Sequence, residues 1–220
     1  MNVVLTKRAL KVFIDKYGAD NTVQIYNPVD AAVFAATGEY DPESKKIISV
    51  GRLTYQKNFQ AAVKVASEVL PKFPDWQWDI FGQGEDLEEL IRLAKEAQID
   101  EQMHFNGQVT DLYERYKQYS IMVMTSRYEG FPMTLLEGIG NGLPLVSFDI
   151  PTGPSEIIDD GENGYLLQEG DINGMVYRLD QLMSNQNLRI AMSDNSRTKS
   201  RAFAIQDITE EFGKALHAVV

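Results

Sequence analysis

The sequence predicts an α/β fold, a Rossmann-like doubly wound parallel sheet of about six strands flanked by helices. From residue 46 onward, short apolar runs of strand length alternate with segments whose apolar residues recur at helical spacing. Glycines follow three of the predicted strands, at Gly51, Gly82 and Gly107. Residues 120–142 contain an apolar run, a polar loop and a helix-like segment in succession, which is half of a βαβ unit.

The part of the chain before residue 46 has a different organisation. Residues 3–5 and 22–26 are apolar enough for strands, and residues 6–18 have helical spacing and end at Gly18, a residue that commonly terminates helices. Residues 29–45 show no clear period, so we interpret them as a linker.

The elements after the linker are predicted in order from apolar runs and helical spacing. Asn58 is expected to cap the helix that follows the first of these strands, and Ile91 is expected on the inner face of the next helix. The predicted strands are residues 46–50, 76–81, 103–106, 121–124, 143–148 and 165–167. The predicted helices include residues 59–70, 110–118, 133–139, 171–184, 186–198 and 203–219.

Composition excludes several classes of function. The 220 residues suffice for one large domain, or one domain with an appendage. A net charge of −11 argues against a nucleic-acid binder, which needs a basic face. The chain has no cysteine and two histidines, so thiol catalysis and histidine-rich metal sites are not expected. The first residues lack a signal-peptide core and no apolar run is long enough to span a membrane, so we expect a cytoplasmic protein.

The segment from Ser120 to Gly142 is the strongest candidate for a binding site. Ligands of open α/β sheets bind where strands end and helices begin, and a helix start offers free N–H groups to an anion. Pro132 has no N–H, so the donors would be Met133 and Thr134, with Phe131 as a third. Gly130 allows the backbone to approach a ligand closely.

Charged residues surround this junction. Glu129 and Glu137 flank the helix start, as hydroxyl-binding carboxylates on either side of a phosphate would, although both could be ordinary surface acids. Arg52 and Lys57 lie between another strand and its helix, where they could reach a diphosphate. The alternative for this second pair is that both are ordinary surface cations.

Two further features of the sequence, a glycine pair and a histidine, have structural interpretations. Gly82 and Gly84 follow a strand and precede a helix, but Leu87 occupies the third glycine position of the dinucleotide fingerprint, so we interpret the glycines as a turn lining a pocket. His104 lies inside a short predicted strand with no partner in sight, which favours a half-buried structural histidine over a catalytic one.

These residues resemble a known family. Over about residues 22–185, the chain is similar to the C-terminal, donor-binding domain of retaining glycosyltransferases of family 4, which have the GT-B fold. The hallmark is two glutamates with seven residues between them, Glu129-Gly130-Phe131-Pro132-Met133-Thr134-Leu135-Leu136-Glu137. Supporting motifs occur in the right order, Val50-Gly51-Arg52-Leu53 with Lys57-Asn58, Phe81-Gly82-Gln83-Gly84, Phe105-Asn106-Gly107 and Asn163-Gly164-Tyr165-Leu166.

The resemblance implies roles for individual residues. Arg52 and Lys57 would hold the donor diphosphate and stabilise the departing nucleotide, Glu129 would contact the transferred sugar, and these three form the implied catalytic set. Glu137 would bind the ribose hydroxyls, and residues 107–109 would lie near the base. The implied donor-binding residues are Gly51, Gly82, Gly84, Val109, Gly130, Phe131, Met133, Thr134 and Glu137. No metal and no cofactor is implied, and the donor would be a nucleotide sugar linked to UDP or GDP.

The resemblance also implies a larger enzyme. Residues 1–28 resemble the end of an N-terminal acceptor domain, residues 46–200 the donor domain, and residues 201–220 a helix that crosses back to the missing domain. The enzyme would be a hexosyltransferase that acts on a saccharide or lipid-linked acceptor in cell-surface polysaccharide biosynthesis. It would work in the cytoplasm or at the cytoplasmic face of the membrane. This chain alone would be inactive. Gly138 and Gly140 depart from the family's usual alanines, and closer helix–sheet packing would compensate for their lower helix propensity.

The sequence leaves two other functions open. One is a non-catalytic module that binds a nucleotide or phosphosugar and needs a separate partner chain. The other is a dinucleotide-dependent oxidoreductase, which the missing third glycine disfavours.

Overall fold

The computed structural model, which describes residues 1–29, 33 and 40–217, has the predicted α/β fold. Its main sheet has six parallel strands in the order β5-β4-β3-β6-β7-β8. The strand order reverses between β3 and β6, which is the point where doubly wound sheets bind their ligands. The strands are β3 (Lys46–Val50), β4 (Gln77–Phe81), β5 (Met103–Phe105), β6 (Ile121–Met124), β7 (Leu145–Asp149) and β8 (Gly164–Gln168).

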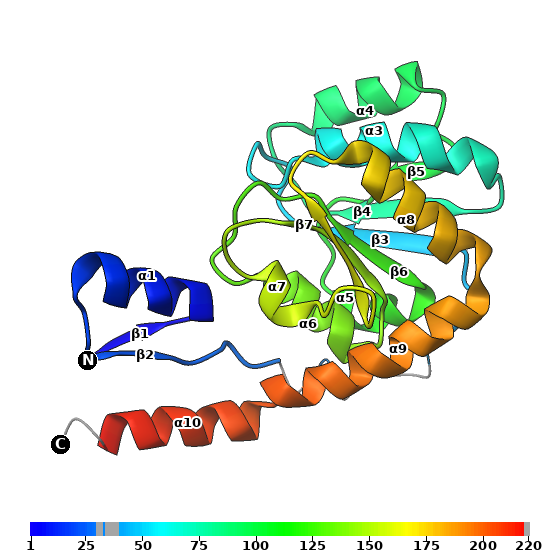
Figure 1. The fold of residues 1–220 in the computed structure, drawn as a ribbon. Helices are drawn as coiled ribbons and strands as arrows, with labels where there is room; N and C mark the ends of the chain where they lie inside the picture. Colours follow the sequence, from blue (N-terminus) through cyan, green and yellow to red (C-terminus); the bar gives the residue numbers. More distant parts are fainter. Residues whose placement is uncertain (30–32, 34–39, 218–220) are drawn as a thin grey trace.

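Helices cover both faces of the sheet, as Figure 1 shows. On one face, α3 (Phe59–Val69) packs against α4 (Leu87–Glu96) and α8 (Ile172–Ser184). On the other face, α6 (Met133–Gly140) packs against α9 (Gln186–Ser200). The short helical turns are η1 (Leu70–Lys72), α5 (Leu112–Arg115), η2 (Tyr116–Gln118), α7 (Pro154–Ile157) and η3 (Arg201–Phe203).

The two covered faces explain why the strands are apolar throughout instead of alternating. In β3, consecutive residues Ile47 and Ile48 are both fully buried although they point to opposite faces. Buried Ser49 donates from its hydroxyl to the Val123 carbonyl at 2.7 Å and accepts from the Trp78 indole nitrogen at 3.0 Å. The polar atoms in this part of the core are therefore hydrogen-bonded.

Close packing explains the two glycines in α6, as the sequence suggested. A Cβ on Gly138 would lie 2.6 Å from the Met122 sulfur and 2.9 Å from a Leu145 methyl carbon. A Cβ on Gly140 would lie 2.7 Å from a methyl carbon of Val33. The helix therefore gives up propensity at both positions in exchange for a closer approach to its neighbours.

The N-terminal residues form a separate small unit beside the main sheet (Figure 1). Strands β1 (Asn2–Val4) and β2 (Thr22–Gln24) pair in parallel and α1 (Lys7–Tyr17) connects them. Thr6 caps α1 through its hydroxyl, and Gly18 ends the helix with a φ of 59°. The C-terminal helix α10 (Ile205–His217) extends from the end of α9 towards the side on which this unit lies.

The structure differs from the prediction in α4. Ile91 was expected on the inner face of α4 but is exposed. The buried face of this helix is formed by Leu90 and Ala94. Most of the predicted linker, residues 30–32 and 34–39, lies outside the described residues, so the division into domains stays a prediction. No helix among residues 1–29 and 40–217 is long and apolar enough to cross a membrane.

Candidate functional site

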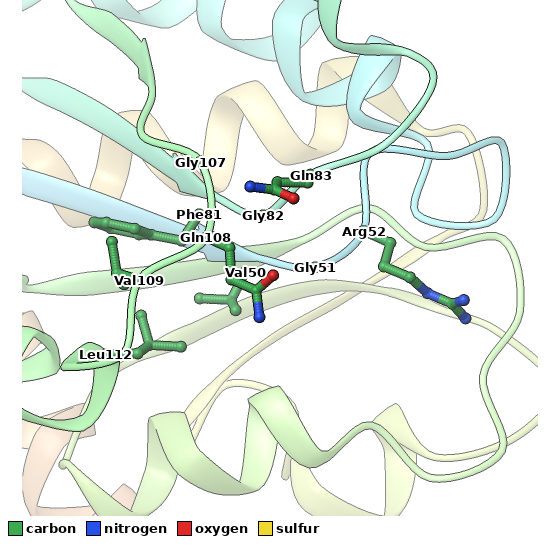
Figure 2. A pocket seen from close by; sticks show the side chains of 10 residues that line it. All are labelled: Val50, Gly51, Arg52, Phe81, Gly82, Gln83, Gly107, Gln108, Val109 and Leu112. Carbon is green, nitrogen blue, oxygen red and sulfur yellow. The ribbon is translucent and has the colours of Figure 1, made fainter.

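A cavity of about 530 Å³ opens at the carboxyl edge of the sheet, where β3, β4 and β5 end (Figure 2). The three predicted strand-end glycines, Gly51, Gly82 and Gly107, all line it. The expectation that these strand ends meet at one edge is confirmed. The other lining residues are Val50, Arg52, Phe81, Gln83, Gln108, Val109 and Leu112.

The cavity has an apolar end and a cationic end. Phe81, Val109 and Leu112 gather at one end, and the Arg52 side chain extends away from them at the other. Arg52 is exposed and forms no ion pair with any residue that the structure describes. The cavity therefore offers a flat group an apolar surface and offers an anion an unneutralised guanidinium.

The loops that form the cavity are held together by their backbones. The N–H of Gly51 donates to the Phe81 carbonyl at 2.9 Å. A Cβ on Gly82 would lie 1.9 Å from the Gly51 carbonyl oxygen, and one on Gly84 would lie 2.1 Å from the Leu53 carbonyl oxygen. Gly82 thus lines the cavity as predicted, but Gly84 does not, because its backbone packs against that of Leu53.

Lys57 lies outside this cavity and forms a largely buried ion pair with Glu129. Its Nζ lies 2.7 Å from Glu129 Oε1, and the two side chains are 15% and 9% exposed. The aliphatic part of Lys57 packs against Gly51, where a Cβ would lie 3.0 Å from its Cδ. An anion that reaches Lys57 must therefore share it with the carboxylate of Glu129.

The polar loop after β6 is fixed to the loop before α3 by side-chain hydrogen bonds. Thr125 Oγ1 donates to the Lys57 carbonyl at 3.1 Å, and the Arg127 guanidinium donates to Asn58 Oδ1 at 2.8 Å. Asn58 occupies the predicted cap position, but its φ is 54° and its side chain makes no capping bond. The predicted cap position is therefore confirmed, but the side chain does not cap, because Arg127, distant in sequence, takes its oxygen.

The start of α6 has the expected free backbone donors. The first N–H of this helix that donates within the chain is that of Leu135, which bonds to the Pro132 carbonyl at 3.0 Å. The N–H groups of Met133 and Thr134, which precede it, have no acceptor among the described residues. A Cβ on Gly130 would meet nothing within 4 Å, so space for a ligand lies beside the backbone here.

Phe131 does not point into the cavity. Its ring stacks on Tyr26 at 5.4 Å between centroids and lies 6.1 Å from the ring of Phe203. Its side chain therefore anchors the loop against residues from both ends of the chain.

Glu137 lines a second cavity, of about 370 Å³, together with Tyr113 and Met133. Leu112 lines the first cavity and its neighbour Tyr113 lines the second, so α5 lies between the two. Glu137 Oε2 accepts a hydrogen bond of 2.6 Å from the buried hydroxyl of Tyr116. The two glutamates of the hallmark therefore lie in different surroundings, Glu129 against a lysine and Glu137 against tyrosines.

Sequence reasoning missed several of these residues. Gln83 and Leu112 line the cavity and Tyr116 holds Glu137, but none of them was singled out as a site residue. Gln108 was expected only as part of the stretch 107–109 near the base, and it lines the cavity.

His104 has a partner that the sequence did not reveal. Its Nδ1 lies 2.9 Å from Asp79 Oδ1 on the neighbouring strand, and the Tyr119 hydroxyl donates to the other oxygen of Asp79 at 2.7 Å. His104 is half-buried, so its predicted structural role is consistent with this network. In the described part of the chain, no group of three or more histidine and acidic side chains is placed to hold a metal ion.

Comparison with known proteins identifies relatives of this chain. The sequence model of the family described as glycosyl transferases group 1 matches residues 34–199. An uncharacterized glycosyltransferase of Haemophilus influenzae is 34% identical over 210 residues, which cover 96% of this chain and 59% of that protein. The lipopolysaccharide 1,6-galactosyltransferase of Escherichia coli K12 is 32% identical over 179 residues, covering 79% of this chain and 49% of that protein.

A solved structure shares the fold. The pneumococcal O-GlcNAc transferase GtfA, in complex with UDP and GlcNAc, superposes with a TM-score of 0.85 at 26% identity. The match covers 99% of this chain and 44% of that one. This chain thus spans only about half of the length of such relatives.

Proposed function

Because the chain belongs to the group 1 glycosyltransferases, we propose that it is the nucleotide-sugar-binding domain of a retaining family 4 enzyme. The whole enzyme transfers a hexosyl group from a nucleoside-diphosphate sugar to a saccharide or lipid-linked acceptor, in cell-surface polysaccharide biosynthesis. The name of the Escherichia coli relative, which specifies lipopolysaccharide, supports this class of product.

One observation carries the proposal. Along one sheet edge lie a cavity with an apolar end, three sets of donors and two carboxylates. The donors are Arg52, Lys57 and the free N–H groups at the start of α6. A nucleotide sugar needs this order of groups, since it has a flat base, a ribose, a diphosphate and a sugar. The apolar end of the cavity suits the base, and Arg52 and the start of α6 suit the diphosphate.

The two hallmark glutamates bind the two hydroxyl-bearing parts of the donor, the ribose and the transferred sugar. Glu137 binds the ribose, because it lies on the far side of α5 from the base cavity. Glu129 binds the transferred sugar, and its bond to Lys57 keeps the carboxylate beside the phosphate-binding groups. Carboxylates accept hydrogen bonds from hydroxyls, and such charge-assisted bonds are short and strong.

Transfer requires stabilisation of the leaving nucleoside diphosphate, on which negative charge develops. Arg52, Lys57 and the N–H groups of Met133 and Thr134 supply preorganised positive charge for it, which is the kind of electrostatic stabilisation that contributes most to many enzymes. The proposed mechanism assigns no step to a metal ion.

The rest of the enzyme supplies the acceptor side. This chain spans about half of its relatives, so we propose that an N-terminal domain completes the active site and that this chain alone binds the donor without appreciable transfer. The titration that tests the donor site uses UDP, GDP and ADP, followed by their sugars, in calorimetry. Saturable binding of one nucleotide is expected, and binding of NAD instead of all three would overturn the proposal.

Substitution of the cations tests the assignment of the phosphate site. Arg52→Ala and Lys57→Ala are each expected to weaken binding of the nucleoside diphosphate by about tenfold to a hundredfold, since each removes a charge-assisted contact. The control is Lys72→Ala, which removes an exposed cation that lies 3.6 Å from Asp180, far along the chain from the site. Unchanged affinity in both test variants would contradict the proposed phosphate site.

A further inference from the structure

Tyr116 is the largest polar-tipped side chain buried beside the candidate site. It has no exposed surface, and its hydroxyl donates to Glu137 Oε2 at 2.6 Å. The bond joins η2 to α6 across 21 positions of sequence. A buried hydroxyl bonded to a carboxylate fixes both the position and the rotamer of that carboxylate.

The segment that carries Tyr116 also forms a wall of the base cavity. Leu112, at the start of α5, lines the first cavity, and Tyr113 lines the second cavity with Glu137. Tyr116 follows on the next turn, so the same seven residues, 112–118, contact both parts of the proposed nucleoside site. The position of Glu137 is therefore tied to the wall against which the base would lie.

The phenol of Tyr116 remains a hydrogen-bond donor at any working pH. Burial, followed by the nearby charge of Glu137, raises the pKa of Tyr116 well above its ordinary value. The bond thus keeps one direction, from the hydroxyl to the carboxylate.

We propose that Tyr116 is a positioning residue for the nucleotide, which holds the Glu137 carboxylate in the orientation that binds the ribose hydroxyls. The inference rests on the proposed function, because it takes Glu137 as the ribose ligand. Tyr116 itself touches no part of the donor and acts through Glu137.

The test compares ribose recognition with and without the Tyr116 hydroxyl. Tyr116→Phe keeps the ring in the core and removes only the donor. Calorimetry measures the tightest-binding of UDP, GDP and ADP, and the 2′,3′-dideoxy form of that nucleotide, with both proteins. The wild-type chain should bind the dideoxy form at least about tenfold more weakly, because a site built for a hydroxyl rejects a ligand without it.

The variant should lose this discrimination. Tyr116→Phe is expected to bind the ordinary nucleotide about tenfold more weakly than the wild type, and the dideoxy form within about twofold of the wild-type affinity. A Glu137 carboxylate that is no longer held in one orientation weakens only the contacts to the ribose hydroxyls. Tyr119→Phe is the matched control, because the Tyr119 hydroxyl is also buried and bonded to a carboxylate, that of Asp79 at 2.7 Å. It should leave the discrimination unchanged.

The outcomes separate the two proposals. If the wild type binds no nucleotide, the proposed donor site fails together with this inference. If it binds the ordinary and dideoxy nucleotides equally, the assignment of Glu137 to the ribose and this inference fail, while the donor site stands. If the wild type discriminates and Tyr116→Phe discriminates as well as it does, the donor site stands and the positioning role is overturned. Equal weakening of both nucleotides by Tyr116→Phe also overturns it, since that result means that the hydroxyl only stabilises the fold.

Discussion

Lys57 and Glu129 are the most tightly coupled charges of the candidate site. They lie 2.7 Å apart with side chains that are 15% and 9% exposed. Water screens such a pair poorly, and removal of one partner leaves the other charge without compensation in a poorly hydrated place. Loss of either partner should therefore lower the free energy of unfolding, whether or not the pair also contacts a ligand.

A double-mutant cycle measures this coupling. Lys57→Met and Glu129→Gln are each expected to destabilise the fold by about 3 kcal/mol, and the double variant by less than the sum of the two, with a coupling of at least about 1 kcal/mol. Urea unfolding of the four proteins gives these values. The comparison pair is Lys214 and Glu210, which lie 2.8 Å apart with side chains 72% and 68% exposed.

The comparison cycle sets the scale for an exposed pair. The same substitutions at positions 214 and 210 should couple by less than about 0.5 kcal/mol. A coupling of that size at Lys57 and Glu129 would mean that the two side chains are hydrated in solution, contrary to their burial in the structure.

Sequence reasoning identified the residue types of the site but not their partners. Arg52, Lys57 and Glu129 lie in loops that follow strands and Glu137 lies on α6, as the local pattern predicts. Their roles stay predictions. Their contacts join segments far apart in the chain, as Lys57 to Glu129 does across 72 positions. Such pairings depend on which strands become neighbours, and a single sequence does not record that.

The loops after β3 and β4 behave as one element of the site. Leu53 donates from its N–H to the Gln83 carbonyl at 2.9 Å and accepts at its own carbonyl from the Asp86 N–H at 3.0 Å. Gly84 fits between them only because it has no Cβ. The position of Arg52, which lies between Gly51 and Leu53, depends on this contact.

Gly84→Ala tests whether the contact is required. The added Cβ would meet the Leu53 carbonyl oxygen at 2.1 Å, and backbone cannot move aside as a flexible side chain can. We expect a loss of about 1–3 kcal/mol in the free energy of unfolding, and weaker nucleotide binding as Arg52 is displaced. Gly213→Ala in α10 is the control, because a Cβ there meets nothing within 4 Å.

The control should move in the opposite direction. Alanine in place of a helical glycine stabilises a helix by up to about 1 kcal/mol when no clash opposes it. If Gly84→Ala retains wild-type stability in chemical denaturation, the two loops are not in backbone contact in solution.

Elements were predicted well where both hydrophobic pattern and breakers agreed. Strands β3 and β6 have the predicted bounds, because each is a continuous apolar run followed by a loop. The predicted helix 110–118 is instead the short α5 followed by η2. The orientation of α4 was misjudged at Ile91, since several apolar residues close together leave the buried stripe ambiguous.

At the scale of the whole molecule, one carboxylate joins the N-terminal unit to the main body. Glu156 of α7 accepts from the N–H groups of Lys7 and Arg8 at 2.8 and 3.4 Å, and from the Tyr26 hydroxyl at 2.7 Å. It therefore lies at the N-terminus of α1, where the helix dipole favours a negative charge. Burial and this bond to Glu156 raise the pKa of Tyr26, so its hydroxyl remains a donor.

The hydrogen bonds of Glu156 predict that a single substitution loosens one unit without changing the proposed donor site. In Glu156→Ala, amide hydrogens of residues 7–26 should exchange about tenfold to a hundredfold faster, because charge-assisted bonds of this kind are each worth about 1.5–3 kcal/mol. Exchange in the β3–β8 sheet and nucleotide affinity should stay as in the wild type. Hydrogen-exchange mass spectrometry with peptide resolution measures this contrast.

A neighbouring carboxylate provides the control for that experiment. Asp149 lies 3.6 Å from the Arg8 guanidinium in a pair whose side chains are 54% and 40% exposed, so Asp149→Ala should change exchange little. Unchanged exchange of residues 7–26 in Glu156→Ala would show that the unit is held mainly by other contacts, such as the stacking of Tyr26 on Phe131. Faster exchange confined to the unit would instead show that the hydrogen bonds of Glu156 hold it against the main sheet.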